Sequence, residues 1–228
     1  MKVGLLVCDQ VRTEYRTEFG SYPEMFQALF PDYEFEIYRV HKGEFPDVMD
    51  CEVYMATGSS HSVYEDIEWI HQTKAFIRKL YEANRYFIGF CFGHQLLAEA
   101  LGGKVEKADI GWCVGVHEFE VLHIKHWMRP AKTQVNFLMM CQDQVVQLPP
   151  NTIRLAGNND CPNAIIQIGE RILSIQGHPE FTRNYNQTLM EGRVKRMGVE
   201  KVTAGIASLT KPIDIDLFRA WVARFLEG

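Results

Sequence analysis

The sequence predicts an α/β protein with a mostly parallel central sheet, helices on both faces and short antiparallel strands added to that sheet. Through residue 102, short apolar runs alternate with segments of helical character, as in strands joined by crossover helices. From residue 103 to 178, short β-like runs are instead separated by turn residues. The chain has 228 residues, of which 46% are hydrophobic and 23% charged, so we expect one globular domain over residues 1–228.

The first half of the chain supplies the expected parallel strands and their helices. In the segment Asp66 to Ala83, apolar residues fall near i, i+7, i+8 and i+11, which is the stripe of an amphipathic helix. Short apolar runs indicate buried strands, and the alternation of polar and apolar residues in Glu34–Val40 also indicates a strand. The expected strands are Lys2–Cys8, Glu34–Val40, Cys51–Ala56 and Tyr86–Phe90, and the expected helices are Pro23–Phe30, Asp66–Ala83 and Leu96–Leu101.

The second half is expected to add antiparallel strands and to end in a helix. The clearest helical stripe lies at Ile213–Leu226, where five large apolar residues share one face. The expected strands are Gly115–Ile124, Thr152–Ala156, Ala164–Ile168 and Arg171–Ile175.

Composition restricts the partners. The 24 basic and 29 acidic side chains give a net charge of −5, which argues against nucleic acid as a partner and favours small-molecule substrates. No segment approaches about 18 consecutive apolar residues, so no membrane span is expected. The apolar run Val3–Cys8 is shorter than a signal-peptide core, and the six cysteines form no CxxC pair, so we expect a cytoplasmic protein with free thiols.

No cofactor or metal site is expected. The segment from His117 to His126 contains three histidines, but alternation places His123 and His126 on opposite faces of a strand, and two ligands do not make a zinc site. Glycine-rich phosphate motifs are absent from the sequence.

Cys91 is the candidate nucleophile. It lies in Gly89-Phe-Cys91-Phe-Gly93, between a predicted strand and a predicted helix. Small neighbours allow the sharp backbone turn that exposes a nucleophile at such an elbow. At the start of a helix, the sulfur would face unpaired N–H groups and the positive end of the helix dipole, both of which favour the thiolate.

The candidate base is His178, in the segment Gln176-Gly-His178-Pro-Glu180. Side chains two positions apart in an extended chain point to the same side, and Pro179 favours that conformation for the residue before it. Glu180 can then accept a hydrogen bond from one imidazole nitrogen, which leaves the other nitrogen free to take the proton of Cys91.

Acyl transfer also requires donors for the developing oxyanion. The expected strand ending at Ala56 is followed by Thr57-Gly58-Ser59-Ser60, small residues from which a backbone N–H can turn toward a neighbouring strand end. Its partner would be the N–H of Phe92, directly after the nucleophile.

Together, GFCFGHQ, QGHPEF and the TGSS loop resemble the class I, or triad, glutamine amidotransferase domain, which has a flavodoxin-like fold. Leu101-Gly-Gly-Lys-Val105 and Gln142-Asp143-Gln144-Val145 resemble the amidotransferase domain of GMP synthase and its stand-alone relatives, and the chain is most similar to the group that includes the γ-glutamyl peptidases. The resemblance implies the following roles: Cys91 as nucleophile, His178 as general base and acid, Glu180 as its orienting partner, Phe92 and Ser59 as oxyanion donors, and Gln95 and Gly58 as substrate-binding residues.

Two positions depart from GMP synthase. Ser59 replaces the second glycine of a Gly-Gly-Pro loop, and Gln142 replaces a histidine. The resemblance implies a thioester mechanism on a γ-glutamyl amide. The substrate is either a γ-glutamyl compound cleaved by the chain alone or glutamine, whose ammonia passes to a separate synthetase subunit. A DJ-1-like stress protein and a catalytically silent binding module are the alternatives from other classes.

Overall fold

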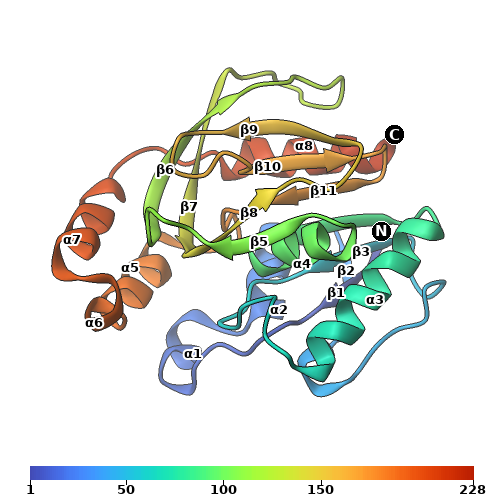
Figure 1. The fold of residues 1–228 in the computed structure, drawn as a ribbon, viewed down its shortest axis with the longest axis horizontal. Helices are drawn as coiled ribbons and strands as arrows, with labels where there is room; N and C mark the ends of the chain where they lie inside the picture. Colours follow the sequence, from blue (N-terminus) through green and yellow to red (C-terminus); the bar gives the residue numbers. More distant parts are fainter.

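A nine-stranded sheet runs through the computed structural model, which describes all residues from 1 to 228 (Figure 1). Five neighbouring strands are parallel and the four that follow are antiparallel. In order across the sheet they are β2 (Glu34–Tyr38), β1 (Lys2–Leu6), β3 (Val53–Ala56), β4 (Tyr86–Phe90), β11 (Ile172–Ile175), β10 (Ile165–Ile168), β9 (Thr152–Gly157), β6 (Cys113–Val121) and β7 (Gln134–Cys141). The predicted fold class is therefore confirmed.

A second, two-stranded sheet pairs β5 (Lys104–Lys107) with β8 (Asp143–Gln147). It packs against the helix that follows β4, through Val105 and Val145. The sequence pattern did not single out β5, β7 or β8 as strands, although it placed β-like runs throughout this region.

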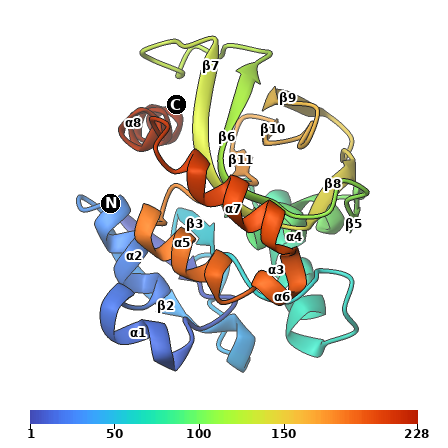
Figure 2. The same ribbon diagram turned by 90° about the vertical axis from the view of Figure 1, so that its left-hand side faces the viewer.

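Helices cover both faces of the parallel strands (Figures 1 and 2). One face packs against α3 (Glu68–Glu82) and α4 (Phe92–Ala100), and the other against α2 (Tyr22–Leu29) and α8 (Ile215–Glu227). Successive residues of β3 alternate between these two cores and all four are buried. This explains why the strand reads as one continuous apolar run rather than as an alternating pattern.

A third core lies beneath the β6–β7 hairpin, where α5 (Arg183–Glu191), α6 (Val194–Met197) and α7 (Val199–Ser208) form a separate helical group (Figure 2). Met190 and Val202 pack there against Val114 and Leu138. The sequence pattern predicts no element in residues 183–208, so this helical group is a feature that only the structure shows.

The sequence pattern predicts no element in residues 9–22, between the first strand and the first helix, but Thr13–Phe19 forms the helix α1. None of its residues is fully buried, and only Tyr15 and Phe19, four residues apart, pack against the third core, so its apolar face is too narrow to predict a helix from the sequence. A 3-10 turn, η1 (Val40–Lys42), ends the segment after β2.

Candidate active site

Cys91 lies on a strained turn between β4 and α4. Its backbone has φ 49° and ψ −98°, values that cost a non-glycine residue about 1–3 kcal/mol. Flanking glycines make the turn possible. A Cβ on Gly89 would lie 2.5 Å from the carbonyl oxygen of Gly93, and a Cβ on Gly93 would lie 2.5 Å from that of Ala56. The Gly-x-Cys-x-Gly pattern therefore has a steric cause.

The strands that carry the three sequence motifs are neighbours. β4 pairs in parallel with β3 on one side and with β11 on the other, so their carboxyl ends meet at one edge of the sheet. Gly58, Cys91 and His178 follow these ends. A Cβ on Gly58 would lie 3.0 Å from His178 Cε1 and 3.8 Å from Cys91 Cβ, so Gly58 sits between the two side chains.

His178 and Glu180 form a buried pair. The distance from His178 Nδ1 to Glu180 Oε1 is 2.7 Å, and their side chains are 4% and 0% exposed. The imidazole stacks on Phe181, with ring centroids 4.0 Å apart, and its Nε2 has no hydrogen-bond partner. Burial by itself lowers the pKa of His178, but the negative charges of Cys91 and Glu180 outweigh it and raise that pKa to about 10. The pair can therefore hold a proton on the imidazole when Cys91 is ionised.

Phe92 and Ser59 contribute backbone N–H groups near Cys91. Phe92 begins α4, so its N–H has no partner inside the helix. The N–H of Ser59 donates no hydrogen bond, and Ser59 lines the pocket that contains Cys91.

Gln95 is buried rather than exposed on the first turn of α4. Its Nε2 donates to the carbonyl oxygen of Asp143 at 2.7 Å and to Gln176 Oε1 at 3.1 Å. Sequence reasoning missed Gln176, which is buried and donates from Nε2 to Cys91 Sγ at 3.5 Å. The signal was available, since Gln176 lies two residues before His178 in an extended segment and so points to the same side.

His94, the other histidine close to Cys91 in sequence, lies apart from this pair. It is fully buried, and its Nδ1 lies 2.8 Å from Ser174 Oγ. Burial lowers the pKa of His94 to about 3, so its imidazole is neutral throughout the physiological range.

We expect His94 to make the fold sensitive to acid. Because the folded-state pKa lies below the unfolded value of about 6.5, only the unfolded chain takes up this proton as the pH falls below about 6.5. The free energy of unfolding then falls by up to about 1.4 kcal/mol per pH unit from this group, until the pH approaches the folded-state value. Urea titrations between pH 7 and pH 4 should show a shallower loss of stability for His94→Gln than for the unsubstituted chain.

The matched control is His126→Gln, because His126 is exposed. Its stability curve should run parallel to that of the unsubstituted chain. Equal slopes for His94→Gln and His126→Gln would refute the prediction.

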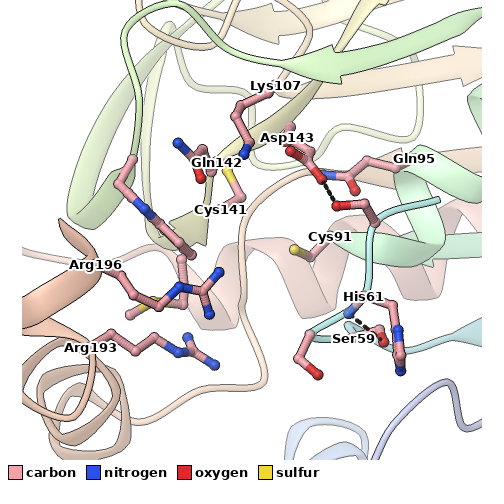
Figure 3. Close-up of a pocket in the computed structure, with 14 residues that line it drawn as sticks. Ser59, His61, Cys91, Gln95, Lys107, Cys141, Gln142, Asp143, Arg193 and Arg196 are labelled. Atoms are coloured by element: carbon pink, nitrogen blue, oxygen red, sulfur yellow. Dashed lines mark hydrogen bonds between the residues drawn. The ribbon is translucent and has the colours of Figure 1, made fainter. Parts of the chain in front are cut away.

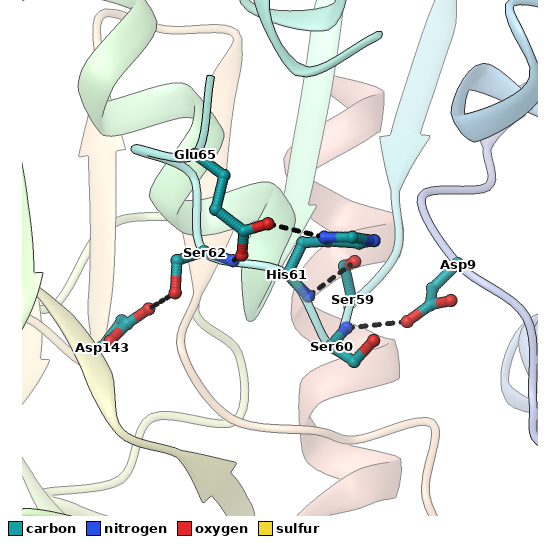
Figure 4. A network of polar contacts seen from close by, with 7 residues as sticks. All are labelled: Asp9, Ser59, Ser60, His61, Ser62, Glu65 and Asp143. Atoms are coloured by element: carbon teal, nitrogen blue, oxygen red, sulfur yellow. Dashed lines mark hydrogen bonds and ion pairs between the residues drawn. The ribbon is translucent and has the colours of Figure 1, made fainter. Parts of the chain in front are cut away.

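The loop after β3 is held at both ends by acidic side chains (Figure 4). The N–H of Ser60 donates to Asp9 Oδ2 at 2.7 Å, and the hydroxyl of Ser62 donates to Asp143 Oδ2 at 2.5 Å. Glu65 accepts from the N–H of Ser62 and lies 2.8 Å from His61 Nδ1. These contacts fix the loop that carries Gly58 and Ser59 across from Cys91.

Two adjoining pockets open onto this edge of the sheet. The first, shown in Figure 3, contains Cys91, Gln95 and Asp143 together with the cations Lys107, Arg193 and Arg196. The second contains His178, Phe181 and Asp9. Four residues line both pockets: Ser59, Ser60, Met140 and Arg193. The two pockets therefore share a wall formed by these four residues.

We expect Gly58→Ala to reduce turnover without unfolding the chain. The added methyl group would press on His178 Cε1 from 3.0 Å, so the imidazole must shift by a few tenths of an ångström. Misplacement of a reacting group can cost up to about 100-fold in rate, and we expect a fall in kcat of about 10-fold or more. Gly58→Ser should cost more. A melting temperature close to that of the unsubstituted chain, combined with unchanged kcat in both variants, would contradict this prediction.

Three further features bear on the sequence expectations. All six cysteines are free and buried. No group of three or more His, Cys, Asp or Glu side chains is arranged to hold a metal ion. No helix combines the length and the apolar character that a membrane span requires.

A mostly parallel α/β sheet with a cysteine on the turn after a central strand, near a buried histidine–glutamate pair, presents a candidate cysteine-dependent active site. The model of the "Glutamine amidotransferase class-I" family matches residues 34–195. The chain belongs to this enzyme family.

The relatives include gamma-glutamyl peptidases and a GMP synthase. Gamma-glutamyl peptidase 4 of Arabidopsis thaliana is 33% identical over 193 residues, covering 78% of this chain and 77% of the relative. A GMP synthase of Leptospira interrogans is 27% identical over 164 residues, covering 68% of this chain and 25% of the relative. The crystal structure of a glutamine amidotransferase from Thermotoga maritima superimposes with a TM-score of 0.79 at 18% identity, covering 99% of both chains, which establishes the shared fold.

Proposed function

We propose that the chain hydrolyses a γ-glutamyl amide through a thioester on Cys91. The observation that carries this proposal is the position of Cys91, on a strained turn across Gly58 from His178, whose other nitrogen is held by Glu180. Membership of the amidotransferase family and similarity to gamma-glutamyl peptidases support the choice of amide.

The first half of the reaction forms the thioester. Cys91 Sγ attacks the γ-carbonyl carbon, a carbon–sulfur bond forms, and the carbon–nitrogen bond to the leaving amine breaks. The raised pKa of His178 favours an imidazolium next to the ionised sulfur, and this imidazolium gives its proton to the departing nitrogen. Glu180 holds Nδ1 and so keeps Nε2 directed at the reacting atoms.

The second half regenerates the enzyme. Water attacks the thioester carbon and gives a proton to His178 Nε2, and the carbon–sulfur bond breaks as the glutamyl carboxylate leaves. In both halves the backbone N–H groups of Phe92 and Ser59 stabilise the negative charge on the carbonyl oxygen.

Gln95 and Gly58 are proposed to shape the site for the glutamyl group. Gln95 Nε2 already donates hydrogen bonds to Asp143 and Gln176. Gln95 therefore acts by holding Gln176 in position and by forming part of the pocket wall. Because Gly58 has no side chain, the space between Cys91 and His178 stays open.

The proposal is tested by incubating the purified chain, without ATP or a second protein, with glutamine, glutathione and γ-glutamyl dipeptides. Release of glutamate together with the matching amine or ammonia would support it. No release from any of these compounds, under conditions where the chain is folded, would refute the version in which the chain acts alone.

A second candidate is a glutaminase subunit that delivers ammonia to a separate synthetase. The similarity to a GMP synthase, of which this chain covers a quarter, favours it. Glutamine hydrolysis that appears only when an ATP-dependent ligase is added would select this candidate. The six free cysteines support a reducing compartment such as the cytoplasm for either version.

A further inference from the structure

Cations gather around the two pockets although the chain as a whole is acidic. The linings contain four cations, Arg12, Lys107, Arg193 and Arg196, against two carboxylates, Asp9 and Asp143, while the whole chain carries a net charge of −5. A local excess of positive charge at a binding site favours an anionic ligand.

Both carboxylates already have partners within the protein. Asp9 accepts hydrogen bonds from the backbone N–H groups of Gln10 and Ser60, and Asp143 accepts from the hydroxyls of Ser62 and Tyr64. Neither carboxylate makes an ion pair with a pocket cation. Arg193, Arg196 and Lys107 form no salt bridge.

Arg193 is the most confined of these cations. It is half-buried, its guanidinium makes no hydrogen bond, and burial is the main cause that lowers its pKa. The nearby Tyr22 and Tyr185 do not supply a counter-charge, because burial raises the pKa of both phenols and keeps them neutral. A partly desolvated guanidinium without an anion is unfavourable until a ligand provides one.

The position of Arg193 indicates which part of the substrate it meets. Figure 3 shows the guanidinium groups of Arg193 and Arg196 across the pocket from Gln95 and Asp143, with Cys91 between the two sides. Arg193 is also the one cation that lines both pockets, the second of which contains His178. The leaving nitrogen must lie near His178 to receive its proton, so groups attached to that nitrogen extend toward Arg193.

We infer that Arg193, supported by Arg196, binds a carboxylate on the leaving group, so that the preferred substrates are γ-glutamyl amino acids or peptides with a free carboxylate rather than glutamine. This inference rests on the proposed function and specifies its substrate class. A guanidinium binds a carboxylate through two parallel hydrogen bonds, which gives both affinity and direction.

The kinetic test compares γ-glutamyl-glycine, γ-glutamyl-glycinamide and glutamine. The unsubstituted chain should prefer the free carboxylate over the capped amide by about 10-fold or more in kcat/KM, the usual worth of a charge-assisted contact. Arg193→Gln should abolish this preference, mainly by raising KM for γ-glutamyl-glycine, and Arg193→Lys should restore part of it. Arg224→Gln, on the exposed face of α8, is the matched control and should change nothing.

Two outcomes would overturn the inference. One is equal cleavage of the capped and uncapped compounds by the unsubstituted chain. The other is an equal loss on all three substrates in Arg193→Gln, which would place the arginine on the glutamyl group or in a structural role.

A binding measurement separates this inference from the proposed function. Calorimetry with Cys91→Ala, which has no nucleophile, should show γ-glutamyl-glycine binding about 10-fold more tightly than γ-glutamyl-glycinamide, and Arg193→Gln should remove that difference. If the unsubstituted chain hydrolyses neither compound but the binding difference persists, the proposed function fails and the carboxylate site stands. Equal binding of the two compounds refutes the carboxylate site.

Discussion

Replacing Cys91 with alanine or serine is expected to abolish hydrolysis of every γ-glutamyl substrate while the fold persists. Only the thiolate at this turn can form the thioester, and loss of a nucleophile costs about 10⁴-fold or more in kcat. Alanine leaves only a small cavity beside Gln176. Alanine or serine at position 91 must adopt φ near 49°, as Cys91 already does, so the backbone strain is similar and the fold should change little in either variant. Product release at saturating substrate, together with circular dichroism, measures both effects.

The control is Cys113→Ala, because Cys113 is buried on β6 and does not line either pocket. This variant should keep its activity. A glutamine-like alkylating reagent should label Cys91 first, and mass spectrometry that finds Cys113 or Cys141 labelled in preference would overturn the assignment.

Replacing His178 with alanine is expected to be nearly as damaging as replacing Cys91, since a triad acts as a unit and its single losses are far from additive. The variant should also change the pH dependence of the first half of the reaction. Because the negative charges of Cys91 and Glu180 raise the pKa of His178 to about 10, the proton that the departing nitrogen needs is present up to that pH. Single-turnover release of the amine by the unsubstituted chain should therefore fall as the pH passes about 10, and the residual rate of His178→Ala should show no such fall.

Glu180→Gln is the graded comparison for this pair. It keeps the size of the side chain but removes the charge that helps to raise the pKa of His178, so a smaller loss than in His178→Ala is expected. If His178→Ala kept more than a tenth of the original kcat, another base would be required. His94 could not supply it, because it is fully buried and burial lowers its pKa to about 3, which makes its imidazole a weak base.

The sequence by itself determined the fold class and the identity of the candidate residues. The strands around Val3, Val53 and Phe87 are buried on both faces of the parallel sheet, so nearly every residue in them is apolar. Such continuous apolar runs can be recognised in the sequence. The glycines flanking Cys91 are equally readable, because a sharp turn excludes side chains wherever it occurs. The single domain over residues 1–228 and the roles of the site residues stay predictions.

Contacts between distant segments were decided only by the tertiary structure. Gln176 joins Gln95 to the sulfur of Cys91, and Ser62 meets Asp143 across 81 residues of chain. The position of Arg193 beside both pockets depends on α5 and α6 packing under the β6–β7 hairpin. Periodicity reports which face of an element is buried, but not which element covers it. Pairings between polar groups far apart in sequence therefore leave no local pattern, and the chemistry at the leaving-group side of the pocket could be read only from the folded chain.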